Sequence, residues 1–159
     1  MPLPAKDFMT RVVHTAKETD SVGKIAKIMD KHRVSCVVIL DDRERVKGVM
    51  TERDIVRDII DNDVDYSEPV GKYLSSPVNK VDDDADILIL SRYLTRNRMK
   101  RLIVMHGGKM VGIVTQTDIL RASMLYIQDL SQKLMVGNFD KKTYKKKLDS
   151  IFSVVKNLS

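Results

Sequence analysis

The sequence predicts an α+β fold built from two similar βαββα halves that pack as one pseudo-twofold module, followed by a C-terminal helical extension. An internal repeat is the main observation, because residues 48–57 (GVMTERDIVR) nearly match residues 112–121 (GIVTQTDILR). The repeat extends upstream, since residues 8–10 (FMT) recur 65 positions later as residues 73–75 (YLS). A unit of this size has a marginal core by itself, so we expect the two halves to share one compact domain.

Each half contains the same elements in the same order. A short strand comes first. Asp20 and Ser21 can then cap a helix whose apolar residues follow helical spacing and which ends near His32 and Arg33, and Asp86 precedes the equivalent helix of the second half. Two apolar strands follow, predicted at residues 37–40 and 46–50 in the first half and at residues 102–105 and 110–114 in the second. The last helix of each half begins at a Thr-x-x-Asp motif.

The offset between the halves falls from 65 to 64 residues between these two strands. The turn at residues 41–45 faces a shorter one at residues 106–109. A hairpin turn absorbs such a loss, whereas a strand would lose its register.

We divide the chain into repeat 1 at residues 5–62, an acidic linker at 63–70, repeat 2 at 71–123 and a helical extension at 124–159. In the extension, the helix from Asp118 is predicted to continue through Leu134 until Gly137 and Asn138 end it. A second helix has one apolar face, formed by Tyr144, Leu148, Ile151, Phe152, Val155 and Leu158. This face must be buried, either against the preceding helix or against a second copy of the chain.

The positive charge is concentrated in the extension. Residues 132–159 hold seven Lys and two Asp and so supply five of the six net positive charges of the chain. The lysines could contact nucleic-acid phosphates or an anionic membrane surface, or they could form a solvated helix face. We favour helix packing or homodimerisation over nucleic-acid binding, and we expect no membrane association.

Catalytic chemistry has little support in the sequence. His14, His32 and His106 are dispersed, and the single Cys36 lies in an apolar run typical of a buried strand. No metal-ligand spacing and no phosphate-binding loop is present. We therefore expect no enzyme activity, no catalytic or metal-binding residues and no required cofactor. No apolar stretch approaches a membrane helix and no leader opens the sequence, so we expect a cytoplasmic protein.

The two copies of Gly-h-h-Thr-x-x-Asp-h-h-Arg, together with the matching lead-in Lys6–Thr10, resemble the tandem CBS (cystathionine-β-synthase) domain pair, also called a Bateman module. The resemblance covers roughly residues 5–123. It implies two clefts that bind an adenosine-containing effector, namely AMP, ADP, ATP or S-adenosylmethionine, and a regulatory role without chemistry.

The family motif corresponds here to Thr51 and Asp54 in one cleft and to Thr115 and Asp118 in the other. An ionised carboxylate can accept hydrogen bonds from both hydroxyls of a ribose. The alternative is that each Thr only caps the helix that follows it, and the two roles are compatible. Val49 and Ile113, on the strands that lead to these corners, are included in the predicted clefts.

The resemblance also implies that each cleft includes residues of the other repeat. For the Asp118 cleft these are Thr10, Val13, His14, Val34 and Ser35. For the Asp54 cleft they are Ser75, Val78, Asn79, Met99 and Lys100.

The two predicted clefts differ in charge. Lys100 and Arg101 occupy the position where nucleotide-binding relatives often have basic residues that reach phosphates, whereas repeat 1 has Ser35 and Cys36 there. Repeat 1 has Arg53 where repeat 2 has a threonine, so phosphate affinity is predicted between Arg53, Lys100 and Arg101. The alternative is that these cations are solvated surface residues. We expect one good site, and the asymmetry also allows a ligand with little phosphate, such as S-adenosylmethionine or methylthioadenosine.

The sequence thus predicts a regulatory sensor that binds an adenosine derivative and signals to a protein partner that the sequence does not identify. The alternative is a structural, oligomerisation or interaction module with empty clefts, with or without a basic nucleic-acid-binding tail. Ligand binding distinguishes the two.

Overall fold

The computed structural model describes residues 3–135 and 140–156. Its residues form two compact units. The repeat-1 unit is Val12–Asn79, and the repeat-2 unit combines Met1–Arg11 with Lys80–Ser159. Each unit contains one three-stranded sheet, and the order strand, helix, strand, strand, helix is the same in both. The predicted α+β class is confirmed.

The repeat-2 unit is built on a mixed sheet in the order β4-β5-β6, in which β4 pairs in parallel with β5, and β5 pairs antiparallel with β6. Asp86 begins α4 as predicted, because its carboxylate accepts a hydrogen bond from the Leu88 amide at 2.9 Å. The elements of this unit are α1 (Ala5–Phe8), β4 (Lys80–Asp82), α4 (Ile87–Arg96), β5 (Arg101–His106), β6 (Lys109–Thr115), α5 (Gln116–Met135) and α6 (Lys141–Lys156).

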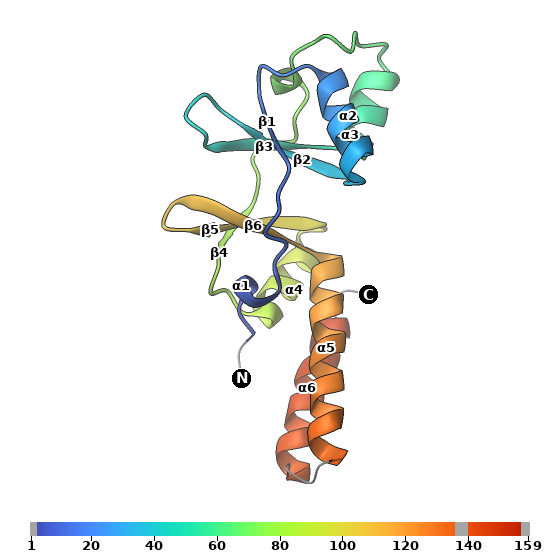
Figure 1. Cartoon of the computed structure of the whole chain (residues 1–159). Coiled ribbons are helices and arrows are strands. Elements are labelled where there is room, and N and C mark those ends of the chain that lie inside the picture. The colour runs from blue at the N-terminus through green and yellow to red at the C-terminus, as the bar shows by residue number, and fades with distance from the viewer. Residues whose placement is uncertain (1–2, 136–139, 157–159) are drawn as a thin grey trace. The chain divides into compact units, whose positions relative to one another are not determined.

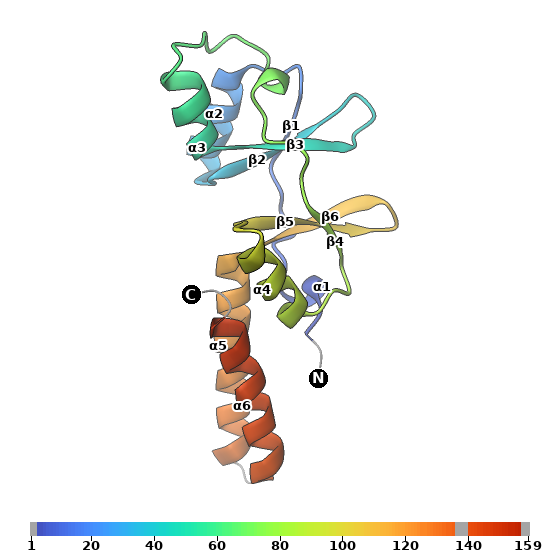
Figure 2. The ribbon, with the colours of Figure 1, turned by 180° about the vertical axis from the view of Figure 1, so that it is seen from behind.

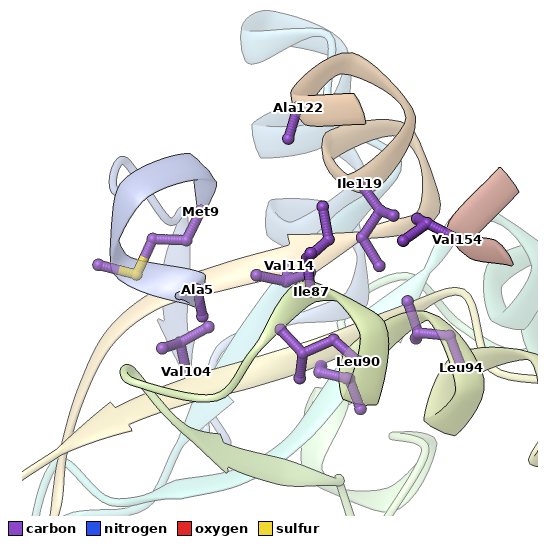
Figure 3. Packing of buried hydrophobic residues seen from close by; sticks show 11 residues of the cluster. Ala5, Met9, Ile87, Leu90, Leu94, Val104, Val114, Ile119, Ala122 and Val154 are labelled. Carbon is purple, nitrogen blue, oxygen red and sulfur yellow. The ribbon is translucent and has the colours of Figure 1, made fainter. Parts of the chain in front are cut away.

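The core of the repeat-2 unit lies between this sheet and its helices (Figure 3). Leu102 and Val104 of β5 and Val114 of β6 are completely buried, as expected for alternate residues on one face of a strand. Leu90 of α4 and Ile119 of α5 close over them. The core is thus aliphatic, in agreement with a sequence that contains no tryptophan.

Helices α5 and α6 lie side by side in both Figure 1 and Figure 2. The predicted continuation of the helix past Asp118 is confirmed as far as Met135, and the predicted break at Gly137 and Asn138 lies outside the described residues. Ile151 and Val154 of α6 are buried, whereas Phe152, predicted on the buried face, is 64% exposed. The correction has a geometric cause, because positions 151 and 154 lie three residues apart on one helix face and position 152 is turned away by about 100°. Leu158 lies outside the described residues.

The repeat-1 unit has the sheet order β1-β2-β3 with the same pairing pattern. Ser21 caps α2, as predicted, by accepting a hydrogen bond from the Lys24 amide, and the helix ends where Arg33 takes a left-handed conformation with φ of 52°. The last helix differs from its counterpart, because after one turn of α3 it continues as the π-helix η1. The elements are β1 (Thr15–Lys17), α2 (Val22–His32), β2 (Cys36–Leu40), β3 (Val46–Thr51), α3 (Glu52–Asp54), η1 (Ile55–Ile60) and η2 (Val70–Lys72).

The predicted one-residue difference between the hairpins is confirmed in the strand register. Leu40 pairs with Val46, whereas the equivalent Met105 pairs with Met110. The shorter turn is possible because Gly107 and Gly108 both have positive φ, at 54° and 79°.

Each unit includes the lead-in of the other repeat. Thr10 pairs with Ile113 of β6 through two backbone hydrogen bonds of 2.9 Å, and Ser75 pairs with Val49 of β3 through bonds of 2.9 and 3.1 Å. A Cβ added at Gly112 would lie 2.9 Å from the Thr10 carbonyl oxygen, and one at Gly48 would lie 2.8 Å from that of Ser75. The glycine of each repeated motif is therefore needed where the lead-in crosses the strand.

Replacing Gly112 with alanine is expected to lower the free energy of unfolding by about 1–3 kcal/mol, because the new methyl group overlaps the backbone of Thr10. Thermal unfolding measures this loss, and hydrogen exchange of the Thr10 and Ile113 amides reports whether the lead-in has detached. An unchanged midpoint with both amides still protected would contradict the explanation.

Candidate functional site

A buried carboxylate lies at the corner between β6 and α5. Asp118 is 5% exposed, and its Oδ2 accepts hydrogen bonds from the Thr115 amide at 2.8 Å and the Thr115 hydroxyl at 2.6 Å. The Thr115 hydroxyl in turn accepts a bond from the Asp118 amide at 3.2 Å. The other oxygen, Oδ1, accepts a bond from the Thr10 hydroxyl at 3.1 Å and lies 3.9 Å from Nη1 of Arg121. We call these residues the repeat-2 corner.

The repeat-1 corner has the same arrangement in the other unit. Asp54 is 4% exposed and is bonded through Oδ2 to the amide and hydroxyl of Thr51, at 2.9 and 2.7 Å. Its Oδ1 accepts bonds from the Ser75 hydroxyl at 3.2 Å and from Nη2 of Arg57 at 3.1 Å. Arg57 also binds Asp58, which is the main reason that its pKa is raised.

The helix-capping role that the sequence left open is therefore present at both corners, with a complete capping box at Thr51 and the same bonds at Thr115. Each Thr hydroxyl already donates one hydrogen bond and accepts another, so only its second lone pair remains for a ligand. A ribose would have to bind through Oδ1. That oxygen is freer in Asp118 than in Asp54, because Asp54 also holds Arg57 at hydrogen-bond distance.

An arginine on the neighbouring strand adds a positive charge beside the repeat-2 corner. Arg101 pairs with Thr115 across β5 and β6, so their side chains leave the same face of the sheet. Nη1 of Arg101 is buried and has no hydrogen-bond partner, and it is the one such side-chain atom within residues 3–135 and 140–156. Cys36 pairs with Thr51 at the equivalent position of repeat 1, so no charged side chain stands there. The phosphate site predicted between Arg53, Lys100 and Arg101 combines residues of both units and stays a prediction.

Several other predicted site residues also lie near these corners within their own units. Lys100 and Met99 precede β5, and their carbonyls accept hydrogen bonds from the amide and the side chain of Gln116, the first residue of α5. Ser35 precedes β2 and accepts a bond from the Glu52 amide at the start of α3. We predicted Met99 and Lys100 in the cleft of Asp54, and Ser35 in the cleft of Asp118. Each of these clefts combines residues of both units and stays a prediction.

The remaining predicted residues lie in the repeat-1 unit. Arg53 is exposed on α3, and Val13, Val34, Val78 and Asn79 are half-buried. Their part in a ligand site also stays a prediction. His14 lies outside the corner and stacks on His32, with ring centroids 4.1 Å apart.

This histidine pair should make stability depend on pH. The pKa of His32 is lowered, first by desolvation and then by repulsion from His14 and Lys31. Because the pKa of His32 is lower in the folded protein, the unfolded chain takes up the proton first as the pH falls. The free energy of unfolding is therefore highest above the ordinary histidine pKa of about 6.5 and decreases as the pH drops below that value. NMR titration should find the pKa of His32 raised in His14→Ala; an unchanged pKa would mean that His14 has no influence.

Two arginines at the corners, Arg57 and Arg121, were not predicted as site residues. The sequence does contain a pattern that could have identified them, because both repeated motifs end in an arginine three residues after the aspartate. On a helix this spacing puts the two side chains on one face.

Comparison with known proteins identifies the family. The CBS domain family model matches residues 5–61 and 70–125. The chain belongs to the CBS-domain family. A relative from Acidianus ambivalens, an uncharacterized 17.7 kDa protein in the bps2 3′ region, is 32% identical over 77% of this chain and 74% of its own length.

Solved CBS structures share the fold. The CBS domain pair of protein MJ0100, in complex with 5′-methylthioadenosine and S-adenosyl-L-methionine, has a TM-score of 0.68 at 23% identity over 77% of this chain and 96% of its own. CBSX2, in complex with AMP, has a TM-score of 0.66 at 24% identity over 77% and 97%. Both of these structures thus contain adenosine compounds.

Two further features, a metal site and a membrane span, are absent from the described ranges 3–135 and 140–156. No cluster of three or more His, Cys, Asp or Glu residues there could hold a metal ion. No helix in the same ranges has the length and apolar character needed to cross a bilayer.

Proposed function

We propose that this CBS-domain protein is a regulatory sensor that binds an adenosine nucleotide, with the ribose on Asp118 and a phosphate on Arg101. The observation that carries the proposal is the buried Nη1 atom of Arg101, which has no hydrogen-bond partner among the described residues. Arg101 is the cross-strand neighbour of Thr115. Buried donors are almost always hydrogen-bonded, and a guanidinium left without a partner is well suited to an anion.

The carboxylate of Asp118 supplies the second half of the recognition. Oδ2 is occupied by Thr115, whereas Oδ1 has one hydroxyl partner, Thr10, and a distant arginine. Because Thr10 is exposed and its hydroxyl can rotate, a ribose hydroxyl can take its place on Oδ1. A hydrogen bond to a charged group contributes roughly 1.5–3 kcal/mol, enough to select a ribose over a compound without hydroxyls.

The charge of the site favours a nucleotide over S-adenosylmethionine. The guanidinium of Arg101, whose Nη1 has no hydrogen-bond partner among the described residues, attracts phosphate and repels the sulfonium of S-adenosylmethionine. The AMP complex of CBSX2 and the methylthioadenosine and S-adenosylmethionine complex of the MJ0100 domain pair show that both ligand types occur on this fold. At 23–24% identity those structures establish the shared fold, so the choice of nucleotide depends on the residues of this chain.

Signalling in this proposal is a shift between two arrangements of the protein that bind the nucleotide with different affinity. We propose that the protein is a cytoplasmic homodimer without catalytic activity that acts on a protein partner. Exposed apolar side chains on α5 support an association surface, since Leu120, Met124 and Leu125 are 45%, 57% and 60% exposed. Sedimentation of the Met124→Lys variant tests the dimer, which this charge should weaken.

A thermal-unfolding panel tests the proposed ligand class. Purified protein, first checked for copurified nucleotide, is heated with AMP, ADP, ATP, methylthioadenosine, S-adenosylmethionine or GTP. A ligand at about 100 times its Kd stabilises by roughly 2.7 kcal/mol, which should raise the midpoint by several degrees. A shift with one of the adenine nucleotides supports the sensor. No shift with any compound would support the alternative, an interaction module with empty clefts.

A further inference from the structure

An open groove lies between α2 and the helix formed by α3 and η1, within the repeat-1 unit. It has a volume of about 390 Å³, and no residue of the repeat-1 corner lines it. Its floor is apolar and partly open to solvent, because Val56 is 59% exposed and both Ala26 and Ile55 are half-buried. The floor consists of Ala26, Met29, Ile55 and Val56, and the charged lining residues are Asp30, Arg33 and Glu52.

The internal repeat gives this floor an equivalent in the repeat-2 unit. Offsets of 65 and 64 residues relate Ala26, Met29 and Ile55 to Ser91, Leu94 and Ile119. These three repeat-2 residues are completely buried, at 0% exposure. The same surface is therefore covered in one repeat and open in the other.

Helix α6 covers the surface in the repeat-2 unit. It contacts both α4 and α5, and its Val154 belongs to the same buried cluster as Leu94 and Ile119. Figure 3 shows Val154 beside Ile119. In the repeat-1 unit, the chain that follows η1 crosses the start of α2 instead, where the Gly23 amide donates a hydrogen bond of 2.9 Å to the Tyr66 carbonyl. The groove is thus the surface on which a helix packs in the other repeat.

The charged residues of the groove favour a basic occupant. Asp30 and Glu52 are exposed, and Arg33 is the one basic residue of the lining, so the carboxylates outnumber the cation. Neither carboxylate forms an ion pair within residues 3–135 and 140–156. The equivalent positions of repeat 2 are Thr95 and Gln116, so the acidic pair belongs to repeat 1.

From this arrangement we propose that the groove binds an amphipathic helix of a protein partner. Apolar side chains at i, i+3 and i+4 of that helix pack on the floor, and its Lys or Arg residues pair with Asp30 and Glu52. The burial of Ser91, Leu94 and Ile119 under α6 is the internal precedent for this packing. This docking surface is separate from the nucleotide proposed at the repeat-2 corner and does not depend on it.

A synthetic peptide with the sequence of residues 141–156 is the probe, because it combines helical apolar spacing with six lysines and one aspartate. It is titrated into the full chain without nucleotide, and NMR shifts give the affinity and the place of binding. We expect saturable shifts of Ala26, Ile55 and Val56. The same peptide with Ile151→Ser and Val154→Ser keeps its charge and should bind at least about tenfold more weakly. No saturable binding, or shifts confined to Ser91 and Ile119, would overturn the proposal, since the latter means that the peptide only replaces α6.

Variants of the full chain test the groove itself. Val56→Lys should weaken peptide binding by at least about tenfold, because it puts a charged side chain on the apolar floor. Ile60→Lys is the matched control, because Ile60 is 54% exposed on the same helix and does not line the groove, and its affinity should stay within twofold. Equal losses in both variants would overturn the proposal.

The acidic pair and a second copy of the chain are tested separately. D30N/E52Q should weaken peptide binding by at least about threefold, whereas D42N/E44Q, which removes two exposed carboxylates from the hairpin, should leave it within twofold. Equal effects of these two double variants would contradict the role of the acidic pair. Sedimentation identifies the remaining occupant: if Val56→Lys converted a dimer to a monomer and Ile60→Lys did not, a second copy would fill the groove and the proposal would be wrong.

Discussion

Replacing Asp118 with alanine is expected to lower the affinity for AMP by tenfold to more than a hundredfold. The carboxylate is 5% exposed, and its Oδ1 is the acceptor with spare capacity at the repeat-2 corner. Loss of a hydrogen bond to a charged acceptor costs roughly 1.5–3 kcal/mol, and a ribose can make two. Calorimetric titration of the variant with AMP measures the change.

The same substitution removes a helix cap, so stability and binding must be separated. Asp118 and Thr115 form reciprocal capping hydrogen bonds at the start of α5. Loss of this cap should lower the free energy of unfolding by about 0.5–2 kcal/mol. Asp129→Ala is the matched control, because it removes an exposed carboxylate from the same helix and should leave AMP affinity within twofold. Asp54→Ala should lose similar stability with a smaller effect on AMP. Unchanged affinity in folded Asp118→Ala would remove the ribose assignment.

Replacing Arg101 with methionine is expected to change stability and binding in opposite directions. Nη1 of Arg101 is buried without a hydrogen-bond partner among the described residues, so the ligand-free protein carries the cost of desolvating that donor. This cost is about 1–3 kcal/mol, and methionine of similar length removes it. The unfolding midpoint of the ligand-free variant should rise, while its stabilisation by AMP should largely disappear.

A change of charge alone must be excluded for this prediction. Lys109→Met removes a positive charge from an exposed position at the hairpin of the same sheet, and we expect neither the midpoint nor the AMP response to change appreciably. If Arg101→Met were destabilised and still responded fully to AMP, Arg101 would be a structural residue and not part of an anion site.

Much of the fold could be predicted because the repeat fixes the same elements twice. Ser21 and Asp86 cap their helices as predicted, and the hairpins differ by one residue in the turn. Helix α6 was predicted from its apolar spacing, but the buried side was misassigned at Phe152. Several helix faces were compatible with that sequence, and only the contact with α4 and α5 selects the one with Ile151 and Val154.

The candidate site was predicted in part. The repeated Thr-x-x-Asp motif identified both carboxylates. The family resemblance assigned Thr10 to the Asp118 site and Ser75 to the Asp54 site, and each of these hydroxyls donates a hydrogen bond to that carboxylate. The sequence could not predict that Nη1 of Arg101 has no hydrogen-bond partner in the described part of the chain, because this depends on which side chains surround it after folding.

Calorimetric titration of the nucleotide-free protein with AMP, adenosine and S-adenosylmethionine under the same conditions tests whether this protein senses an adenosine nucleotide. AMP should bind at least about tenfold more tightly than adenosine, because only AMP carries the phosphate for Arg101. S-adenosylmethionine should bind more weakly than AMP. Equal affinity for AMP and adenosine, or no binding of any of the three, would contradict the claim that this protein senses an adenosine nucleotide.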